Sequence, residues 1–239
     1  MQLQSGSFLQ GGKYKIESIL GQGGFGITYQ ALQTGLNRQV AIKEFFMKDY
    51  CERNEKTSHI IMGTQSSREL VERFRQKFIK EAQIIAGLAH THIISIYDVF
   101  EENDTAYYVM EYIDGGSLKE RIETNGAMSD SEALSYVLQI ADALEYLHHL
   151  KTMHLDVKPS NILLRNNGEA VLIDFGISKR YDDTGNQTSS TPIGISKGYA
   201  PLEQYKQGGV KTFSPGTDIY SLGATLFYLL TSQQPPEAS

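Results

Sequence analysis

Two short segments in the second half of the chain carry side chains whose types and spacing suit phosphoryl transfer. Residues 154–161 contain a carboxylate at Asp156, an amine at Lys158 and an amide at Asn161. Thirteen positions after that amide, Asp174 supplies a second carboxylate. Phosphoryl transfer needs a base to orient a hydroxyl, a cation near the moving phosphate and oxygen ligands for magnesium. These residues therefore predict that chemistry.

A glycine-rich run, Gly21-Gln22-Gly23-Gly24-Phe25-Gly26, fits the pattern G-x-G-x-x-G between two predicted strands. Glycines let the backbone turn sharply and bring its N–H groups close to phosphates. The pattern alone also fits a plain hairpin or the first turn of a dinucleotide-binding fold. A dinucleotide-binding fold requires a helix directly after the glycines. Because Ile27-Thr28-Tyr29 is β-branched and aromatic, a strand is the better prediction.

Lys43 follows the strand-like run Val40-Ala41-Ile42, seventeen residues after Gly26. A lysine on a strand is usually a solvated surface residue, but the glycine-rich run before it favours a contact with nucleotide phosphates. A buried or half-buried ammonium needs a carboxylate partner. Glu81 is the preferred partner because of its position before the next strand, and Glu69 and Glu72 on the same predicted helix are alternatives.

The first half of the chain reads as strands with one helix. Alternating and β-branched residues predict strands at 14–20, 27–32, 40–42, 93–100 and 106–112. Apolar residues at helical spacing follow a capping-box pattern at Ser66 and Glu69 and predict a helix. The polar segment 48–66 before it is expected to be an insertion or a long loop, either inert or able to bind a partner.

The second half reads as mostly helical. A Ser129–Glu132 capping box opens a long predicted helix, and a final apolar helix is expected at about 217–231. Short strands are expected at 162–164 and 171–173, and a polar loop at 181–197. Strands with one helix, followed by helices, indicate an α+β arrangement.

Composition narrows the classes of function. The net charge of −6 over 239 residues argues against a nucleic-acid or anionic-membrane surface. The single cysteine, Cys51, allows no internal disulfide, which fits a reducing compartment, and we expect a cytoplasmic location. The N-terminal residues do not resemble a signal peptide, and the apolar stretch at 222–230 is too short to span a bilayer. We expect no membrane segment in this chain.

Together these motifs resemble a Hanks-type serine/threonine protein kinase of the bacterial kind, from Tyr14 to about Thr231. The resemblance implies a bilobal α+β fold, with an antiparallel sheet and one main helix in the N-lobe. A mostly helical C-lobe would follow, lacking its last helices. The implied divisions are an N-terminal extension at 1–12, the N-lobe at 13–112, a hinge at 113–116 and a partial C-lobe at 117–239.

The resemblance also implies ATP and Mg²⁺, and a role for each matching residue. Asp156 would accept or orient the proton of the substrate hydroxyl, and Lys158 would neutralise charge on the moving phosphoryl group. Lys43 would hold phosphates and pair with Glu81, while Asn161 and Asp174 would bind magnesium. The residues expected to bind the nucleotide are Leu20, Gly21, Gly23, Gly26, Thr28, Ala41, Lys43, Met110, Glu111, Ile113 and Leu163. A stack of Ile85, Ile96, His154 and Phe175 is also implied, although these could simply be core residues.

The chain departs from the family pattern at several positions. Leu155 stands where many kinases have an arginine that binds a phosphate on the activation loop, and leucine offers no charge-assisted bond. We therefore expect activity that does not depend on such a phosphate, although Thr184, Thr188, Ser189, Ser190 and Thr191 could still be phosphorylated. Glu203 matches a glutamate whose arginine partner is missing, because the chain has no arginine after Arg180.

Two positions near the end of the chain complete the comparison with the pattern. Asp218 matches the helix aspartate that holds the catalytic-loop backbone. Since the family normally continues with covering helices, the helix face with Leu222, Leu226, Tyr228 and Leu229 is expected to be partly uncovered and to favour self-association.

The function implied by the resemblance is transfer of the γ-phosphoryl group of ATP to serine or threonine of proteins, including the chain itself. One alternative is a small-molecule phosphotransferase, which shares the Asp-to-Asn spacing. The other is a non-catalytic ATP-binding scaffold or an inactive truncated kinase. No nucleic-acid partner is expected.

Overall fold

The computed structural model describes residues 2–54, 57–63, 65–175, 179–180, 196–205 and 213–238. These residues form two compact units. The first unit comprises Met1–Leu88 and Ser95–Tyr112, and the second comprises Ala89–Ile94 and Ile113–Ser239. The division into extension, lobes and hinge expected from the sequence stays a prediction.

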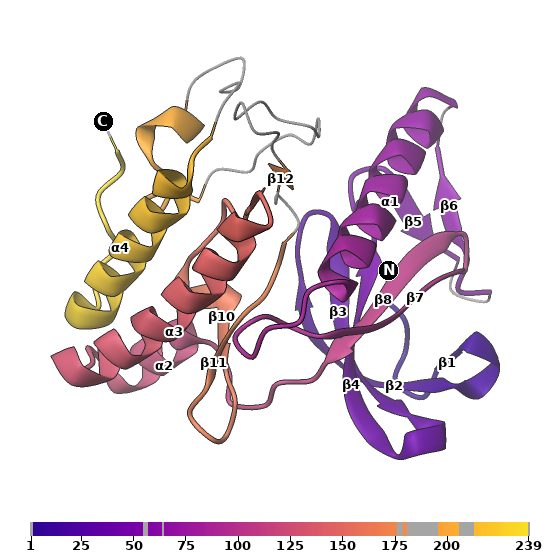
Figure 1. The fold of residues 1–239 in the computed structure, drawn as a ribbon. Coiled ribbons are helices and arrows are strands. Elements are labelled where there is room, and N and C mark those ends of the chain that lie inside the picture. Colours follow the sequence, from indigo (N-terminus) through magenta and orange to yellow (C-terminus); the bar gives the residue numbers. More distant parts are fainter. Residues whose placement is uncertain are drawn as a thin grey trace. The chain divides into compact units, whose positions relative to one another are not determined.

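A six-stranded antiparallel sheet in the order β1-β2-β3-β4-β8-β7 dominates the first unit (Figure 1). The strands are β1 (Phe8–Leu9), β2 (Tyr14–Gln22), β3 (Gly26–Gln33), β4 (Arg38–Phe45), β7 (Ile96–Glu102) and β8 (Thr105–Glu111). The strands expected from β-branched and alternating residues are therefore present. Strand β7 begins at Ile96, three residues later than predicted. Ile94 belongs to the second unit, where its N–H donates to the Leu172 carbonyl, so it does not join β7.

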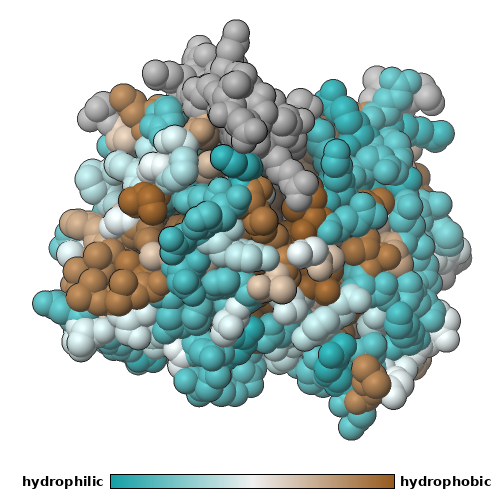
Figure 2. All heavy atoms as spheres, in the orientation of Figure 1, coloured by the Kyte–Doolittle hydropathy of each residue, from teal (hydrophilic) through white to brown (hydrophobic). Residues whose placement is uncertain are grey.

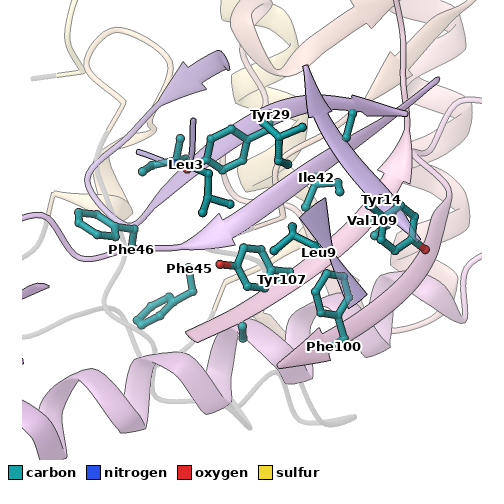
Figure 3. Packing of buried hydrophobic residues seen from close by; sticks show 14 of the residues in the cluster. Leu3, Leu9, Tyr14, Tyr29, Ile42, Phe45, Phe46, Phe100, Tyr107 and Val109 are labelled. Carbon is teal, nitrogen blue, oxygen red and sulfur yellow. The ribbon is translucent and has the colours of Figure 1, made fainter. Parts of the chain in front are cut away.

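One face of this sheet builds the core of the first unit. Figure 3 shows Leu3 and Leu9 packed among Tyr29, Ile42 and Tyr107, and all five are almost completely buried. Leu3 and Leu9 come from the segment expected to be an extension before the N-lobe. This segment contributes both a strand and core side chains, so its loss would expose apolar surface.

The polar segment at 48–66 is not a plain loop. It contains a hairpin of β5 (Cys51–Arg53) and β6 (Ile60–Met62), and both Cys51 and Ile60 are buried in the core of the first unit. Arg53 of this hairpin pairs with Glu44 of β4 at 2.6 Å, and the two side chains are 3% and 0% exposed. The segment is therefore an integral part of the first unit.

Helix α1 (Gln65–Ala86) confirms the predicted helix but not its start. The helix already includes Gln65, so Ser66 lies inside the first turn and cannot be the capping residue before it. Ala82 and Ile85 are buried, as the helical spacing predicted.

The second unit contains α2 (Leu118–Asn125), α3 (Asp130–His149) and α4 (Pro215–Thr231). Short hairpins pair β10 (Ile162–Leu164) with β11 (Ala170–Leu172) and β9 (Thr152–Met153) with β12 (Lys179–Arg180). Ser129 caps α3 by accepting from the Glu132 N–H, as predicted. The reciprocal half of that capping box is absent, because the Glu132 carboxylate binds Arg121 of α2.

The exposed face of α4 differs from the predicted one. Leu222, Tyr228 and Leu229 are buried, so the face expected to be uncovered is mostly packed. The exposed apolar side chains of α4 are Ile219 and Phe227, together with Tyr220. Apolar surface lies over the end of α4 and its neighbouring helices in Figure 2. Among the described residues, no helix combines the length and apolar character needed to cross a membrane.

Candidate active site

The segment between β9 and β10 brings three predicted residues into direct contact. The Lys158 ammonium donates to Asp156 Oδ2 at 2.7 Å. The Asn161 amide nitrogen donates to the same oxygen and to the Asp156 carbonyl, both at 2.9 Å. These bonds fix the carboxylate of Asp156 in one orientation, because a cation and an amide share one of its oxygens.

The other oxygen of Asp156 is bound by Ser196. The Ser196 hydroxyl donates to Asp156 Oδ1 at 2.5 Å, and it accepts from the Lys158 ammonium at 2.9 Å. Asp156, Lys158 and Ser196 therefore form a closed triangle of hydrogen bonds. The hydroxyl of a serine can donate to a carboxylate and accept from an ammonium at the same time.

Asn161 and Asp174 offer oxygen atoms of the kind that magnesium binds. Asn161 is buried in the turn Pro159–Asn161. Its amide nitrogen donates both hydrogen bonds described above, so its side-chain oxygen can act as a metal ligand. The Asn161 carbonyl accepts from the Ile173 N–H at 2.9 Å, which places the amide beside the residue that precedes Asp174. An amide oxygen and a carboxylate, completed by phosphate oxygens, match the ligands that magnesium prefers. The residues present thus fit this ion.

His154 is structural in this arrangement. It is fully buried, and its ring contacts the Phe175 ring edge-on with centroids 4.8 Å apart. Its Nδ1 accepts from the Asp156 N–H at 3.3 Å, so we assign the proton to Nε2, which lies 3.1 Å from the Ile173 carbonyl. Of the four residues expected to stack, these two are in contact within the second unit.

Asp218 of α4 holds the backbone of the same segment. Its buried carboxylate accepts from the Leu155 N–H at 2.7 Å and from the His154 N–H at 3.0 Å. His148 Nε2 lies 2.7 Å from the same carboxylate. Spacing along the chain does not indicate this third contact, because His148 lies on α3, 70 positions before Asp218.

The glycine-rich run forms a hairpin turn between β2 and β3. Gly21 pairs with Thr28, and the Gly23 N–H donates to the Gly26 carbonyl at 2.9 Å. A strand follows the glycines directly, so the dinucleotide-fold alternative is wrong. At Gly26 a side chain is excluded, since a Cβ there would lie 2.7 Å from the Glu44 carbonyl oxygen.

Four of the predicted nucleotide-binding residues share one face of the sheet. Thr28 lies opposite Lys43 in the β3–β4 pair, and Ala41 lies opposite Met110 in the β4–β8 pair. Directly opposed residues in antiparallel strands point to the same side, and Ala41 and Lys43 are two positions apart. Of the remaining members, Leu20 is exposed, Ile113 is buried, and Glu111 and Leu163 are half-buried.

Glu81 stays the preferred partner for Lys43 among the three glutamates of α1. Glu72 forms an ion pair with Arg75 at 2.8 Å, and Glu69 is exposed. Lys43 and Glu81 are both half-buried and belong to the same unit. Their pairing remains a prediction.

The segment after Ser196 is anchored to α4 by a side-chain hydrogen bond. Glu203 accepts from the Thr217 hydroxyl of α4 at 2.8 Å, so a neutral side chain binds this carboxylate. Burial raises the pKa of Tyr199 to about 12, and the neighbouring Tyr228 adds to this effect. The five candidate phosphorylation positions lie outside the described residues.

Comparison with known proteins agrees with these features. Residues 14–239 match the protein kinase domain, and the chain belongs to that family. It is 38% identical over 94% of its length to the serine/threonine-protein kinase PrkC of Bacillus subtilis. It is also 30% identical over 95% of its length to a probable serine/threonine-protein kinase PknB of Bifidobacterium longum.

A solved structure shares the fold. The chain superimposes on a structure described as the apo form of PpkA-294 with a TM-score of 0.81 and 28% identity, covering 99% of this chain and 81% of that one. The α+β protein-kinase fold is therefore confirmed. The chain spans only 31% of the length of PrkC and likewise 31% of PknB.

Proposed function

We propose that this chain is an ATP-dependent protein kinase that phosphorylates serine or threonine. The observation that carries the proposal is the hydrogen-bonded set of Asp156, Lys158, Asn161 and Ser196. A carboxylate bound by both a lysine and a hydroxyl can accept the proton of a substrate hydroxyl that takes the place of Ser196 Oγ. The same lysine then lies within reach of the phosphoryl group as it moves.

Each residue has a defined part in this proposal. Asp156 orients the attacking hydroxyl, and Lys158 stabilises negative charge on the transferred group. Lys43, next to Thr28 on its sheet face, holds nucleotide phosphates, which the turn at Gly21–Gly26 approaches with its backbone N–H groups. Magnesium, which the family uses in general, would be held by Asn161 and Asp174 and would neutralise phosphate charge. Glu81 orients Lys43.

Protein substrates are favoured over small molecules by the segment Ser196–Tyr205. It packs against the catalytic residues through the Ser196–Asp156 bond and against α4 through the Glu203–Thr217 bond. Small-molecule phosphotransferases generally lack such a segment. The relatives named above are serine/threonine kinases, and the chain itself is one candidate substrate. The cytoplasmic location expected from the sequence also remains a proposal.

The test is transfer of labelled γ-phosphate from magnesium-ATP to a generic basic protein and to the chain itself. Asp156→Asn should lower transfer about 10²- to 10⁴-fold and keep nucleotide binding, because this carboxylate orients the acceptor hydroxyl. Asp174→Asn should weaken magnesium-dependent nucleotide binding itself. Asp104→Asn, at a position 62% exposed, is the matched control and should behave like wild type.

The outcomes separate the alternatives. Label on serine or threonine with wild type and none with Asp156→Asn supports the kinase. Equal transfer by wild type and Asp156→Asn would contradict the role of Asp156. Magnesium-ATP binding without any turnover would favour a non-catalytic scaffold, and label appearing only on small-molecule hydroxyls would favour a small-molecule phosphotransferase.

A further inference from the structure

Leu155, directly before Asp156, has an unfavourable backbone conformation. Its φ of +65° lies in the left-handed region, and its side chain is only 2% exposed. A residue with a Cβ adopts this conformation only when its surroundings hold it there. If Leu155 relaxed, the carboxylate of the next residue would move, so whatever holds Leu155 also positions Asp156.

Two buried side chains bind both peptide groups of Leu155. Asp218 Oδ1 accepts from its N–H at 2.7 Å, and Gln204 Nε2 donates to its carbonyl at 3.0 Å. The Asp218 contact is the one that the family pattern implies. The second contact comes from Gln204, which is 7% exposed and lies at the end of the short turn Leu202–Gln204.

The turn that carries Gln204 is itself fixed to α4. Glu203, its neighbour in the chain, accepts from Thr217, and Thr217 precedes Asp218 in the first turn of that helix. A third hydrogen bond therefore connects the turn that carries Gln204 with the helix that carries Asp218. Side-chain hydrogen bonds thus link Leu155, the turn Leu202–Gln204 and α4 to one another.

The amide of Gln204 is only half used. Its Oε1 is buried and has no hydrogen-bond partner among the residues that the structure describes. An unpaired buried oxygen is unfavourable, so methionine, with a similar shape, should be tolerated at this position. Gln204→Met removes that unpaired oxygen and takes the donor away from the Leu155 carbonyl. One unpaired buried oxygen is exchanged for another, so the change in stability should be small.

We propose that Gln204 is a positioning residue for Asp156. It holds Leu155 in its left-handed conformation and so links the segment 196–205 to the orientation of the catalytic carboxylate. This inference rests on the proposed kinase function and concerns how that site is kept in its working arrangement. Because both holding groups are side chains already present in the fold, the arrangement does not require a phosphate on the activation segment.

The experiment compares Gln204→Met with wild type and with Leu202→Met. Leu202 lies in the same short turn and is 51% exposed, so it controls for the new methionine. Steady-state transfer to a basic protein is measured after phosphatase treatment of the enzyme, together with the melting temperature of each variant. Gln204→Met should lower kcat about tenfold, which corresponds to about 1.4 kcal/mol. KM for ATP and the melting temperature should stay close to wild type.

A second variant tests the cause of the loss. Glycine adopts left-handed φ without strain, so Gln204→Met should lower kcat less than about threefold in a Leu155→Gly background. Should Leu155→Gly not fold, Leu155→Asn serves the same purpose, because asparagine tolerates this region.

Two kinds of result would overturn the inference. If wild type is active and Gln204→Met equals it, or if kcat falls only together with the melting temperature, Gln204 does not position Asp156. A loss of the same size in the Leu155→Gly or Leu155→Asn background would also contradict it. If wild type itself transfers no phosphate, the proposed function fails and this inference fails with it.

Discussion

Replacing Arg53 by methionine should strongly destabilise the first unit. The Glu44 carboxylate is fully buried, and it binds Arg53 at 2.6 Å, Tyr29 at 2.8 Å and Tyr107 at 2.5 Å. Burial raises the pKa of both tyrosines, and the nearby Glu44 charge raises it further, so both hydroxyls stay protonated and can donate. Without Arg53, two neutral donors would face a buried charge.

The magnitude follows from that burial. Removing one member of a buried ion pair costs about 3–5 kcal/mol, because the remaining charge has lost its compensation. Arg53 also donates to the Ser58 carbonyl at 2.6 Å within its own hairpin. Because the guanidinium is charged, this hydrogen bond adds about 1.5–3 kcal/mol. We therefore expect Arg53→Met to lower the free energy of unfolding of the first unit by at least about 3 kcal/mol.

The assay is urea unfolding followed by circular dichroism, with the midpoint and slope fitted for each variant. His59→Gln is the matched control, since His59 belongs to the same hairpin and its ion pair with Asp104 is 54% and 62% exposed. That control should change stability by less than about 1 kcal/mol. In the double variant with Glu44→Gln, no charge remains buried, so the combined loss should be smaller than the sum of the single losses.

Either of two results would refute this reasoning. Arg53→Met could cost no more than His59→Gln, which would mean that Glu44 reaches solvent or another cation. Alternatively, the losses of Arg53→Met and Glu44→Gln could add, which would mean that the two side chains do not interact.

Two further predictions concern the first unit. The Phe25 ring of the glycine-rich turn stacks on Phe74 of α1 with centroids 5.6 Å apart, and the chain has no tryptophan. Phe25→Trp should therefore report the position of the turn, and adding Phe74→Ala should shift its fluorescence to longer wavelength; an unchanged spectrum would contradict the stacking. Burial opposes ionisation of Asp98, yet hydrogen bonds from Lys13 and Tyr14 outweigh it and lower the pKa of this carboxyl below its ordinary value. The stability lost in Asp98→Asn should thus be visible at neutral pH and vanish as pH falls through that lowered pKa; a loss that persists in acid would argue against the ion pair.

The arrangement of residues 156–161 could be predicted because its information is local. Asp156, Lys158 and Asn161 lie within six consecutive residues, so a single turn between two short strands brings them together. Their roles stay predictions, but their mutual contacts follow from spacing alone. Ser196 lies 40 positions from Asp156, and only the family pattern could suggest its place.

The hairpin at 51–62 could not be predicted for a physical reason. Its side chains are mostly polar, and an arginine in a polar stretch is normally solvated. Burial of Arg53 depends on Glu44, which alternates with Lys43 on β4 and gives no sign in the sequence that it points into the core. Only the tertiary pairing reveals that this segment is structural.

The face of α4 was misjudged for a related reason. A helix that is apolar nearly all round gives no periodic signal for which side is buried. The resemblance implied an open face with Leu222 and Leu229, because the family normally continues with covering helices. Instead these residues pack inward, and Ile219 and Phe227 lie outside. The side of such a helix that is buried depends on the elements that pack against it. For α4, these include α3 and the segment 154–161, because His148 and the Leu155 N–H both contact Asp218.

Hydrogen bonds with neutral donors hold the segments that pack against α4. Where the pattern has an arginine at position 155, an apolar residue is buried, and Gln204 and Asp218 hold its backbone. The Glu203 carboxylate accepts from the Thr217 hydroxyl in the same region. The donors of these bonds are a backbone N–H, an amide and a hydroxyl, all of them neutral, so the bonds form without a phosphate. A segment held in this way is set when the domain folds, so phosphorylation would have little left to contribute to the orientation of Asp156.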